Sequence, residues 1–144
     1  MYIAVMGYGT VGSGVVEVFL KNHDSIIKKC GQSQLDLKYI LDLRDFPNDP
    51  NKDKFTKDFN DILNDDEVKI VVETMGGLHP AFEFVSSLLK AGKSVVTSNK
   101  ELVAAKGYEL LTIADENNVN FLFEASVGGG IPIIRPLVSS ITSD

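Results

Sequence analysis

Residues 2–12 read YIAVMGYGTVG and contain the two features that decide the fold, an apolar run and a cluster of glycines. The first five of these residues are apolar and rich in strand-forming types, as in a buried β-strand. Apolar residues then recur at helical spacing, at Val11, Val15, Val18 and Phe19. The stretch therefore predicts a strand, a tight turn and a helix in direct succession.

The three glycines of the turn are spaced as GxGxxG, the pattern of a dinucleotide-binding loop. In such a loop Gly7 permits the tight turn, Gly9 lets the backbone approach a pyrophosphate, and Gly12 lets the helix pack closely on the strand. The helix N-terminus adds N–H donors and the positive end of the helix dipole. Turn glycines without a ligand are the alternative, but the position between a strand and a helix favours a dinucleotide.

Further strand patterns follow along the chain. Four apolar segments are predicted strands: residues 37–41, 69–73, 94–97 and 119–123. Residues 69–73, the third predicted strand of the chain, are almost entirely apolar, which is typical of a parallel strand covered on both faces. Residues 44–57 contain two prolines and many charges, so we expect a loop there.

Helical patterns separate these strands. Residues 59–63 are expected to form one or two helical turns. Residues 80–91 begin with a proline and stop before Gly92, which matches the preference for proline at the start of a helix and glycine at its end. The last helix carries an apolar stripe, composed of Leu110, Leu111 and Ala114. The strict alternation predicts one α/β domain over residues 1–144, a doubly wound, Rossmann-type parallel sheet with helices on both faces.

In a sheet of this kind, ligands bind in the crevice beyond the carboxyl ends of the strands. Five loops leave those ends, and they should share one rim. They begin at Gly7, Asp42, Thr74, Ser98 and Ala125. Residues of these loops are therefore the candidates for binding and catalysis.

Composition narrows the class of protein. With 44% hydrophobic and 24% charged residues the chain resembles an ordinary soluble domain, and no apolar run approaches the roughly 20 residues of a membrane span. A net charge of −6 with scattered basic residues argues against a nucleic-acid partner. Cys30 is the single cysteine, and with His23 and His79 it forms no zinc-binding pattern. The first residues do not resemble a secretion signal, so we expect a cytoplasmic protein.

Two charged residues after the second strand bear on the choice of cofactor. Asp42 stands where an acidic side chain commonly accepts hydrogen bonds from the adenosine ribose, which would favour NAD. It lies 30 positions after Gly12, however, more than the usual ~20, and Arg44 is placed to hold the 2′-phosphate of NADP. Both could instead be solvated surface charges. The sequence leaves these alternatives open.

Later loops also reach the rim. Thr74, Met75 and Gly76 follow the third predicted strand, and glycine there permits a backbone path close to a ligand. Lys100 follows the fourth, where the nicotinamide end of a dinucleotide would lie, and a solvated lysine is the alternative. The glycine-rich segment 124–132 is a ligand-binding turn, a hinge, or both.

Together these loops resemble homoserine dehydrogenases along essentially the whole chain. GYGTVG at 7–12 is similar to the family's GFGTVG, ETMGG at 73–77 to EVMGG, VTSNK at 96–100 to VTANK, and EASVGGGIP at 124–132 to EASVAGGIP. Tyr8 replaces a phenylalanine and Gly128 an alanine. The end of the second strand differs more, because it reads LDLRD where the family often has VRD.

The resemblance implies the reversible reduction of L-aspartate 4-semialdehyde to L-homoserine by NADPH or NADH, a step toward threonine and methionine. It implies that Lys100 reaches both the nicotinamide and the substrate. Further cofactor contacts are implied for Tyr8, Thr10, Val11 and Thr74. A monovalent cation, Na⁺ or K⁺, is implied at Glu124, Val127, Gly129 and Ile131.

The family's substrate and dimerisation domain is absent from these 144 residues. We therefore expect the chain alone to bind cofactor without catalysing the reaction, and the full-length enzyme to be a homo-oligomer. Two alternatives are a freestanding dinucleotide-binding or redox-sensing module and another amino-acid dehydrogenase, such as an aspartate dehydrogenase. The motifs at 96–100 and 124–132 favour homoserine dehydrogenase.

Overall fold

The computed structural model describes residues 1–31, 34–123 and 140–141. Its strands are β1 (Tyr2–Met6), β2 (Asp36–Leu41), β3 (Phe55–Thr56), β4 (Val68–Glu73), β5 (Ser94–Thr97) and β6 (Phe121–Phe123). Its helices are α1 (Thr10–Lys21), α2 (His23–Cys30), the 3-10 helix η1 (Lys52–Lys54), α3 (Phe59–Leu63), α4 (Ala81–Lys90) and α5 (Lys100–Glu116). Among the described residues, no helix has the length and apolar character needed to cross a membrane.

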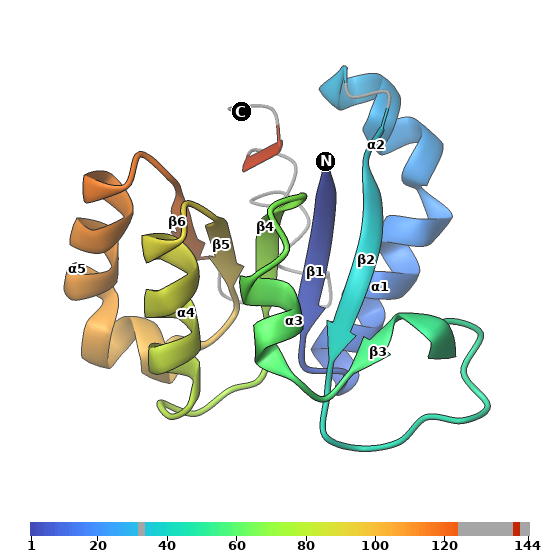
Figure 1. Ribbon diagram of the computed structural model, residues 1–144, viewed down its shortest axis with the longest axis horizontal. Coiled ribbons are helices and arrows are strands. Elements are labelled where there is room, and N and C mark those ends of the chain that lie inside the picture. The colour runs from blue at the N-terminus through green and yellow to red at the C-terminus, as the bar shows by residue number, and fades with distance from the viewer. Residues whose placement is uncertain (32–33, 124–139, 142–144) are drawn as a thin grey trace.

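The six strands form one parallel sheet in the order β3-β2-β1-β4-β5-β6 (Figure 1). β1 therefore lies inside the sheet, paired with β2 on one side and β4 on the other. The chain winds outward from β1 to β3, returns to the middle at β4, and winds outward again to β6. This order joins two mononucleotide-binding halves, and it confirms the doubly wound, Rossmann-type fold that the sequence predicts.

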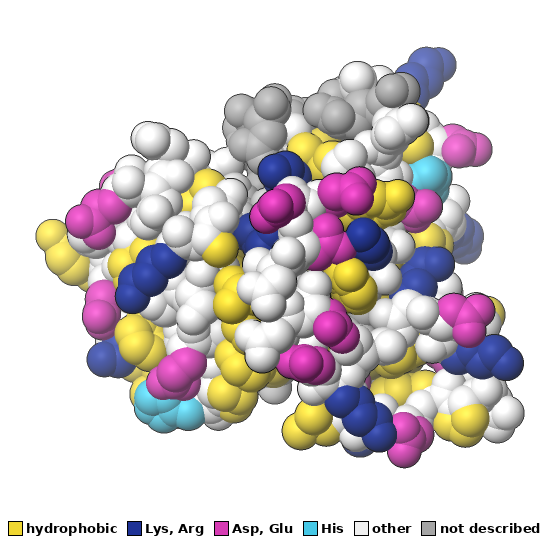
Figure 2. Space-filling view, in the orientation of Figure 1, with side chains coloured by type: hydrophobic (Ala, Val, Ile, Leu, Met, Phe, Trp, Pro, Cys, Tyr) yellow, Lys and Arg dark blue, Asp and Glu magenta, His cyan; other side chains and the backbone are white. Residues whose placement is uncertain are grey.

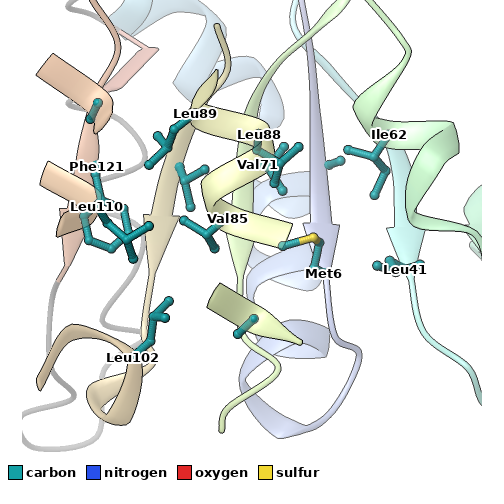
Figure 3. Close-up of a cluster of buried hydrophobic side chains, with 14 of the residues drawn as sticks. Met6, Leu41, Ile62, Val71, Val85, Leu88, Leu89, Leu102, Leu110 and Phe121 are labelled. Carbon is teal, nitrogen blue, oxygen red and sulfur yellow. The ribbon is translucent and has the colours of Figure 1, made fainter. Parts of the chain in front are cut away.

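Apolar side chains alternate between two cores on opposite faces of the sheet, as the two-residue period of a strand requires. Along β1, Ile3 and Val5 belong to the core that α1 and α2 cover, whereas Ala4 and Met6 belong to the core that α3, α4 and α5 cover. Figure 3 shows the second core, with Leu88 of α4 among the side chains that fill it. Both faces of the sheet are thus buried.

Four elements differ most from the sequence prediction, among them the 3-10 helix η1, which lies within the predicted loop of residues 44–57. β3 lies within residues 44–57, which the sequence predicts as a loop, and it pairs with the end of β2 at the edge of the sheet. A two-residue strand is too short to produce an alternation pattern, so no pattern in the sequence marks it. Helix α2 directly follows α1 and has no counterpart among the predicted elements, and β6 begins two residues later than predicted.

Two apolar residues of the predicted helix stripes face solvent. Leu111 is 49% exposed, whereas Leu110 and Ala114 of the same helix are buried. Residues four positions apart share a helix face, but the next residue along points about 100° away, so Leu111 leaves the stripe. Val11 is 38% exposed because it lies in the first turn of α1, at the rim of the sheet.

The turn between β1 and α1 brings two glycines into contact. Gly7 has a φ of +97°, a conformation that L side chains rarely adopt. A Cβ added to Gly12 would lie 1.8 Å from the carbonyl oxygen of Gly7, well inside van der Waals contact. At Gly9, by contrast, an added Cβ would have no neighbour within 4 Å. Gly12 is therefore required for packing, whereas Gly9 faces open space.

We expect Gly12→Ala to lower the free energy of unfolding by about 3 kcal/mol or more, because the methyl group collides with backbone and overpacking of this kind is costly. Gly9→Ala is the matched control and should change stability by less than about 1 kcal/mol, the scale of an altered helix cap. Urea unfolding followed by circular dichroism measures both. Equal stabilities for the two variants would contradict the packing role of Gly12.

Candidate functional site

The carboxyl ends of β1, β2, β4 and β5 lie side by side and form the rim of the sheet from which the loops leave. Met6 at the end of β1 is aligned with Leu41 and with Glu73, and Glu73 is aligned with Thr97. The loops that begin at Gly7, Asp42, Thr74 and Ser98 therefore share one rim, as predicted. The predicted loop at Ala125 lies outside the described residues.

The glycine loop is held in place by hydrogen bonds from both neighbouring strands. The Gly7 amide donates to the Leu41 carbonyl at 2.8 Å. The Thr74 hydroxyl lies 2.9 Å from the Met6 carbonyl and 3.0 Å from the Gly7 carbonyl, both of which can accept from it. Thr74 is thus a structural partner of the loop. Helix α1 begins immediately afterwards without a side-chain cap, which leaves first-turn amides able to bind an anion.

Tyr8 connects the glycine loop to the segment after β2. Its hydroxyl donates to Oδ2 of Asp49 at 2.6 Å, and its ring packs edge-on against Phe46 and Phe55. Burial, with the Asp49 hydrogen bond, raises the pKa of Tyr8 to about 12. The hydroxyl therefore stays protonated at neutral pH and acts as a tether that a phenylalanine could not provide.

Asp42 and Arg44 bind each other at the end of β2. The Asp42 carboxylate accepts from Nε and Nη2 of Arg44 at 3.0 and 2.9 Å, and from the backbone amides of Arg44 and Tyr8. The hydrogen bonds from the Arg44 side chain hold the pKa of Asp42 at about 2, against the opposing effect of burial. The Asp42 side chain is only 10% exposed, whereas that of Arg44 is 64% exposed. Arg44 is therefore the more accessible of the two groups.

A cavity of about 440 Å³ opens between the glycine loop, the end of β2 and the start of α4. It is bordered by seven of the residues that the sequence predicts as cofactor contacts: Gly7, Tyr8, Gly9, Asp42, Arg44, Thr74 and Met75. The sequence prediction missed two aromatic residues of its wall, Phe59 and Phe84, whose rings stack at 4.0 Å. Their apolar character was the only available signal, and only the fold brings α3 against α4.

The charged residues around this cavity are mostly paired. Lys57 at its edge contacts Asp45 at 2.7 Å. On the face that Figure 2 shows, Lys and Arg side chains are interspersed with Asp and Glu. Within the described part of the chain, no group of three or more His, Cys, Asp or Glu residues could hold a metal ion. The predicted cation ligands, Glu124, Val127, Gly129 and Ile131, lie outside the described residues.

Lys100 lies on the other side of the rim, as the first residue of α5. Asn99 caps this helix by accepting a hydrogen bond from the Leu102 amide at 3.0 Å. Lys100 is exposed, and in the part of the chain that the structure describes it forms no ion pair. A cation in the first turn is repelled by the positive end of the helix dipole. The charge of Lys100 therefore lowers the stability of α5 itself.

The predicted site residues therefore fall into two groups. Those on the side of β2 surround the cavity, with Thr10, Val11 and Gly12 opening α1 beside it. Gly76 has a φ of +75° and lies in the loop after β4. Lys100 does not border the cavity and stands beyond β5. The site is long rather than compact, which suits an elongated ligand.

A parallel sheet of this order, with a GxGxxG loop at its centre, defines a dinucleotide-binding domain of Rossmann type. The chain belongs to the homoserine dehydrogenase NAD binding domain family, whose model matches residues 7–124. Membership in this family confirms the resemblance drawn from the loop motifs.

Named relatives agree with this assignment. Homoserine dehydrogenase from Lactococcus lactis is 37% identical over 99% of this chain, and the same enzyme from Corynebacterium glutamicum is 38% identical over 99%. The crystal structure of S. aureus homoserine dehydrogenase at pH 6.5 superposes with a TM-score of 0.78 and 42% identity over 93% of this chain. The chain covers 34%, 32% and 34% of these three proteins, so it spans about a third of their length.

Proposed function

We propose that this chain binds NADP or NAD along the rim and forms the cofactor domain of an enzyme that interconverts L-homoserine and L-aspartate 4-semialdehyde. The observation that carries the proposal is the glycine loop. Gly7 and Gly12 are in contact, Gly9 faces open space, and α1 begins there uncapped. A pyrophosphate fits that arrangement, because backbone amides and the helix dipole can bind its charge without a side chain in the way.

The two groups of rim residues support an orientation for the cofactor. The cavity beside Asp42 and Arg44 has apolar walls for an adenine ring and an exposed guanidinium for a 2′-phosphate. The nicotinamide would then extend past Thr74, Met75 and Gly76 toward β5. This orientation places the reactive ring near Lys100, where the substrate would bind.

Lys100 would act on the substrate's carbonyl oxygen. The bound cofactor supplies the hydride for reduction of the aldehyde and accepts it in the reverse direction. As the hydride adds to the carbonyl carbon, negative charge develops on the oxygen, and a nearby ammonium stabilises that charge or supplies the proton for the hydroxyl. The unfavourable position of Lys100 in the first turn of α5 supports a role in binding or catalysis, since it does not serve the helix.

The remaining expectations follow from the family. We propose a cytoplasmic enzyme of threonine and methionine biosynthesis that works as a homo-oligomer when its substrate domain is present. The monovalent cation at Glu124, Val127, Gly129 and Ile131 remains a prediction.

The basic test is dinucleotide binding by this chain. We expect calorimetry to detect NADPH or NADH binding, and Gly9→Ala to weaken it about tenfold or more, because the added methyl group occupies the space that the pyrophosphate needs. The thermal transition of Gly9→Ala without ligand should lie within a few degrees of that of the wild type, because the altered helix cap changes stability by less than about 1 kcal/mol. An unchanged affinity in a folded Gly9→Ala variant would place the pyrophosphate elsewhere.

Cofactor choice should depend on the Asp42–Arg44 pair. Arg44→Ala should weaken NADPH binding by about 10- to 150-fold, which corresponds to the roughly 1.5 to 3 kcal/mol of a hydrogen bond to a charged group. NADH binding, which involves no 2′-phosphate, should change much less. Asp42→Ala should shift the ratio toward NADPH, since it removes a negative charge and releases Arg44. An NADPH-to-NADH affinity ratio that is the same in all three proteins would remove both residues from the site.

Lys100→Ala should lower kcat in the complete enzyme by roughly 100-fold or more, the scale for losing one acid-base or oxyanion-stabilising group. In the isolated domain, the same variant should be as stable as the wild type or more stable by about 0.3 to 1 kcal/mol, because a repulsion with the helix dipole is removed. Lys100→Arg keeps the charge and tests the need for an ammonium. Near wild-type turnover of Lys100→Ala would identify a solvated surface lysine.

A further inference from the structure

Glu73 is a carboxylate buried at the centre of the rim. It ends β4, its side chain has no exposed surface, and in the described residues it forms no ion pair. Burial raises the pKa of Glu73, and the hydrogen bonds that it accepts act in the opposite direction. A buried carboxyl group is costly unless its oxygens are fully hydrogen-bonded. Its partners therefore indicate why it is there.

The hydrogen bonds of Glu73 reach the loop after β4 and the end of β5. Oε2 accepts from the Met75 amide at 2.8 Å, and Oε1 accepts from the Thr97 hydroxyl at 2.6 Å. The Thr97 side-chain oxygen in turn accepts a hydrogen bond from the backbone amide of Asn99 at 3.0 Å. One carboxylate thus connects the loop after β4 to the loop after β5.

Asn99 closes this network. Its Nδ2 donates to the Gly77 carbonyl at 2.6 Å, while its Oδ1 accepts from the Leu102 amide. Gly76 and Gly77 both have a φ of +75°, so the loop that Asn99 holds follows a path that other residues rarely adopt. The loops after β4 and β5 are therefore fastened to each other and to the first turn of α5.

We infer that Glu73, Thr97 and Asn99 are positioning residues for the nicotinamide half of the cofactor and for Lys100. This inference rests on the proposed function, since it assumes that a dinucleotide lies along the rim. The network holds the loop that the nicotinamide would cross and the helix start from which Lys100 extends. Glu73, Thr97 and Asn99 do not border the cavity beside Asp42, and the network meets the wall of that cavity at the Met75 amide. Loss of the network should therefore affect one end of the cofactor and spare the other.

Thr97→Val and Glu73→Gln disrupt the network at its centre. Valine keeps the shape of threonine and removes the hydroxyl. Glutamine keeps the size of glutamate, but its amide nitrogen cannot accept a hydrogen bond, so either the Thr97 hydroxyl or the Met75 amide loses its acceptor. Thr97→Ser retains the hydroxyl and is the matched control. Asn99→Asp provides a milder test, because aspartate still caps α5 but cannot donate to the Gly77 carbonyl.

The experiment compares two probes by calorimetry on this chain, NADPH and 2′-phospho-ADP-ribose, which lacks the nicotinamide. We expect Thr97→Val, Glu73→Gln and Asn99→Asp to bind NADPH about tenfold more weakly, on the scale of one lost hydrogen bond, while 2′-phospho-ADP-ribose binding changes less than about twofold. Thr97→Ser should bind both probes like the wild type. Circular dichroism identifies the variants that fold. If Thr97→Val and Glu73→Gln do not fold, the Asn99→Asp variant still tests the network.

The outcomes separate the two levels of the proposal. An equal loss of affinity for both probes, or no loss for either in folded variants, would overturn the positioning role and leave the proposed function standing. A wild-type chain that binds neither probe would overturn the proposed function and the positioning role with it.

Discussion

The contact between the Gly7 carbonyl and Gly12 is the constraint on which the rest of the structure depends. It presses the first turn of α1 against the end of β1, a strand that is paired on both sides. No side chain fits at Gly12, and the Thr74 hydroxyl binds the turn from the adjacent strand. The contact between Gly7 and Gly12 packs the helix on the sheet, and it also leaves the first amides of the helix facing the rim. Stability and ligand binding therefore share one short segment.

The carboxylates on the two sides of the rim are stabilised in different ways. On the side of β2, a carboxylate and a guanidinium neutralise each other, with the guanidinium turned outward. On the side of β5, Glu73 is buried without a cation among the described residues and is satisfied by neutral donors. Because the Arg44 guanidinium is exposed, it can exchange the Asp42 carboxylate for a negatively charged group of a ligand. The Glu73 carboxylate cannot be reached by solvent, and its hydrogen bonds fix backbone positions.

Most of the regular structure could be predicted because its signals are local. Five of the six strands matched apolar runs, since a strand buried on both faces must be apolar throughout. β3 could not be predicted, because two residues pair with β2 only after the intervening loop has folded back. Leu111 was placed on the wrong side of α5 because adjacent apolar residues do not show which one faces the sheet.

The sequence by itself determined the fold class, the glycine loop, the family and which loops follow the strands, because each depends on residue types at short spacing. Only the tertiary structure decided how those residues meet. It brought the Asp42 carboxylate to the Tyr8 amide across 34 positions, tied Tyr8 to Asp49 across 41, and joined Glu73 to Thr97 across 24. Such contacts depend on the order and register of parallel strands, and parallel neighbours are distant in sequence because a crossover must separate them.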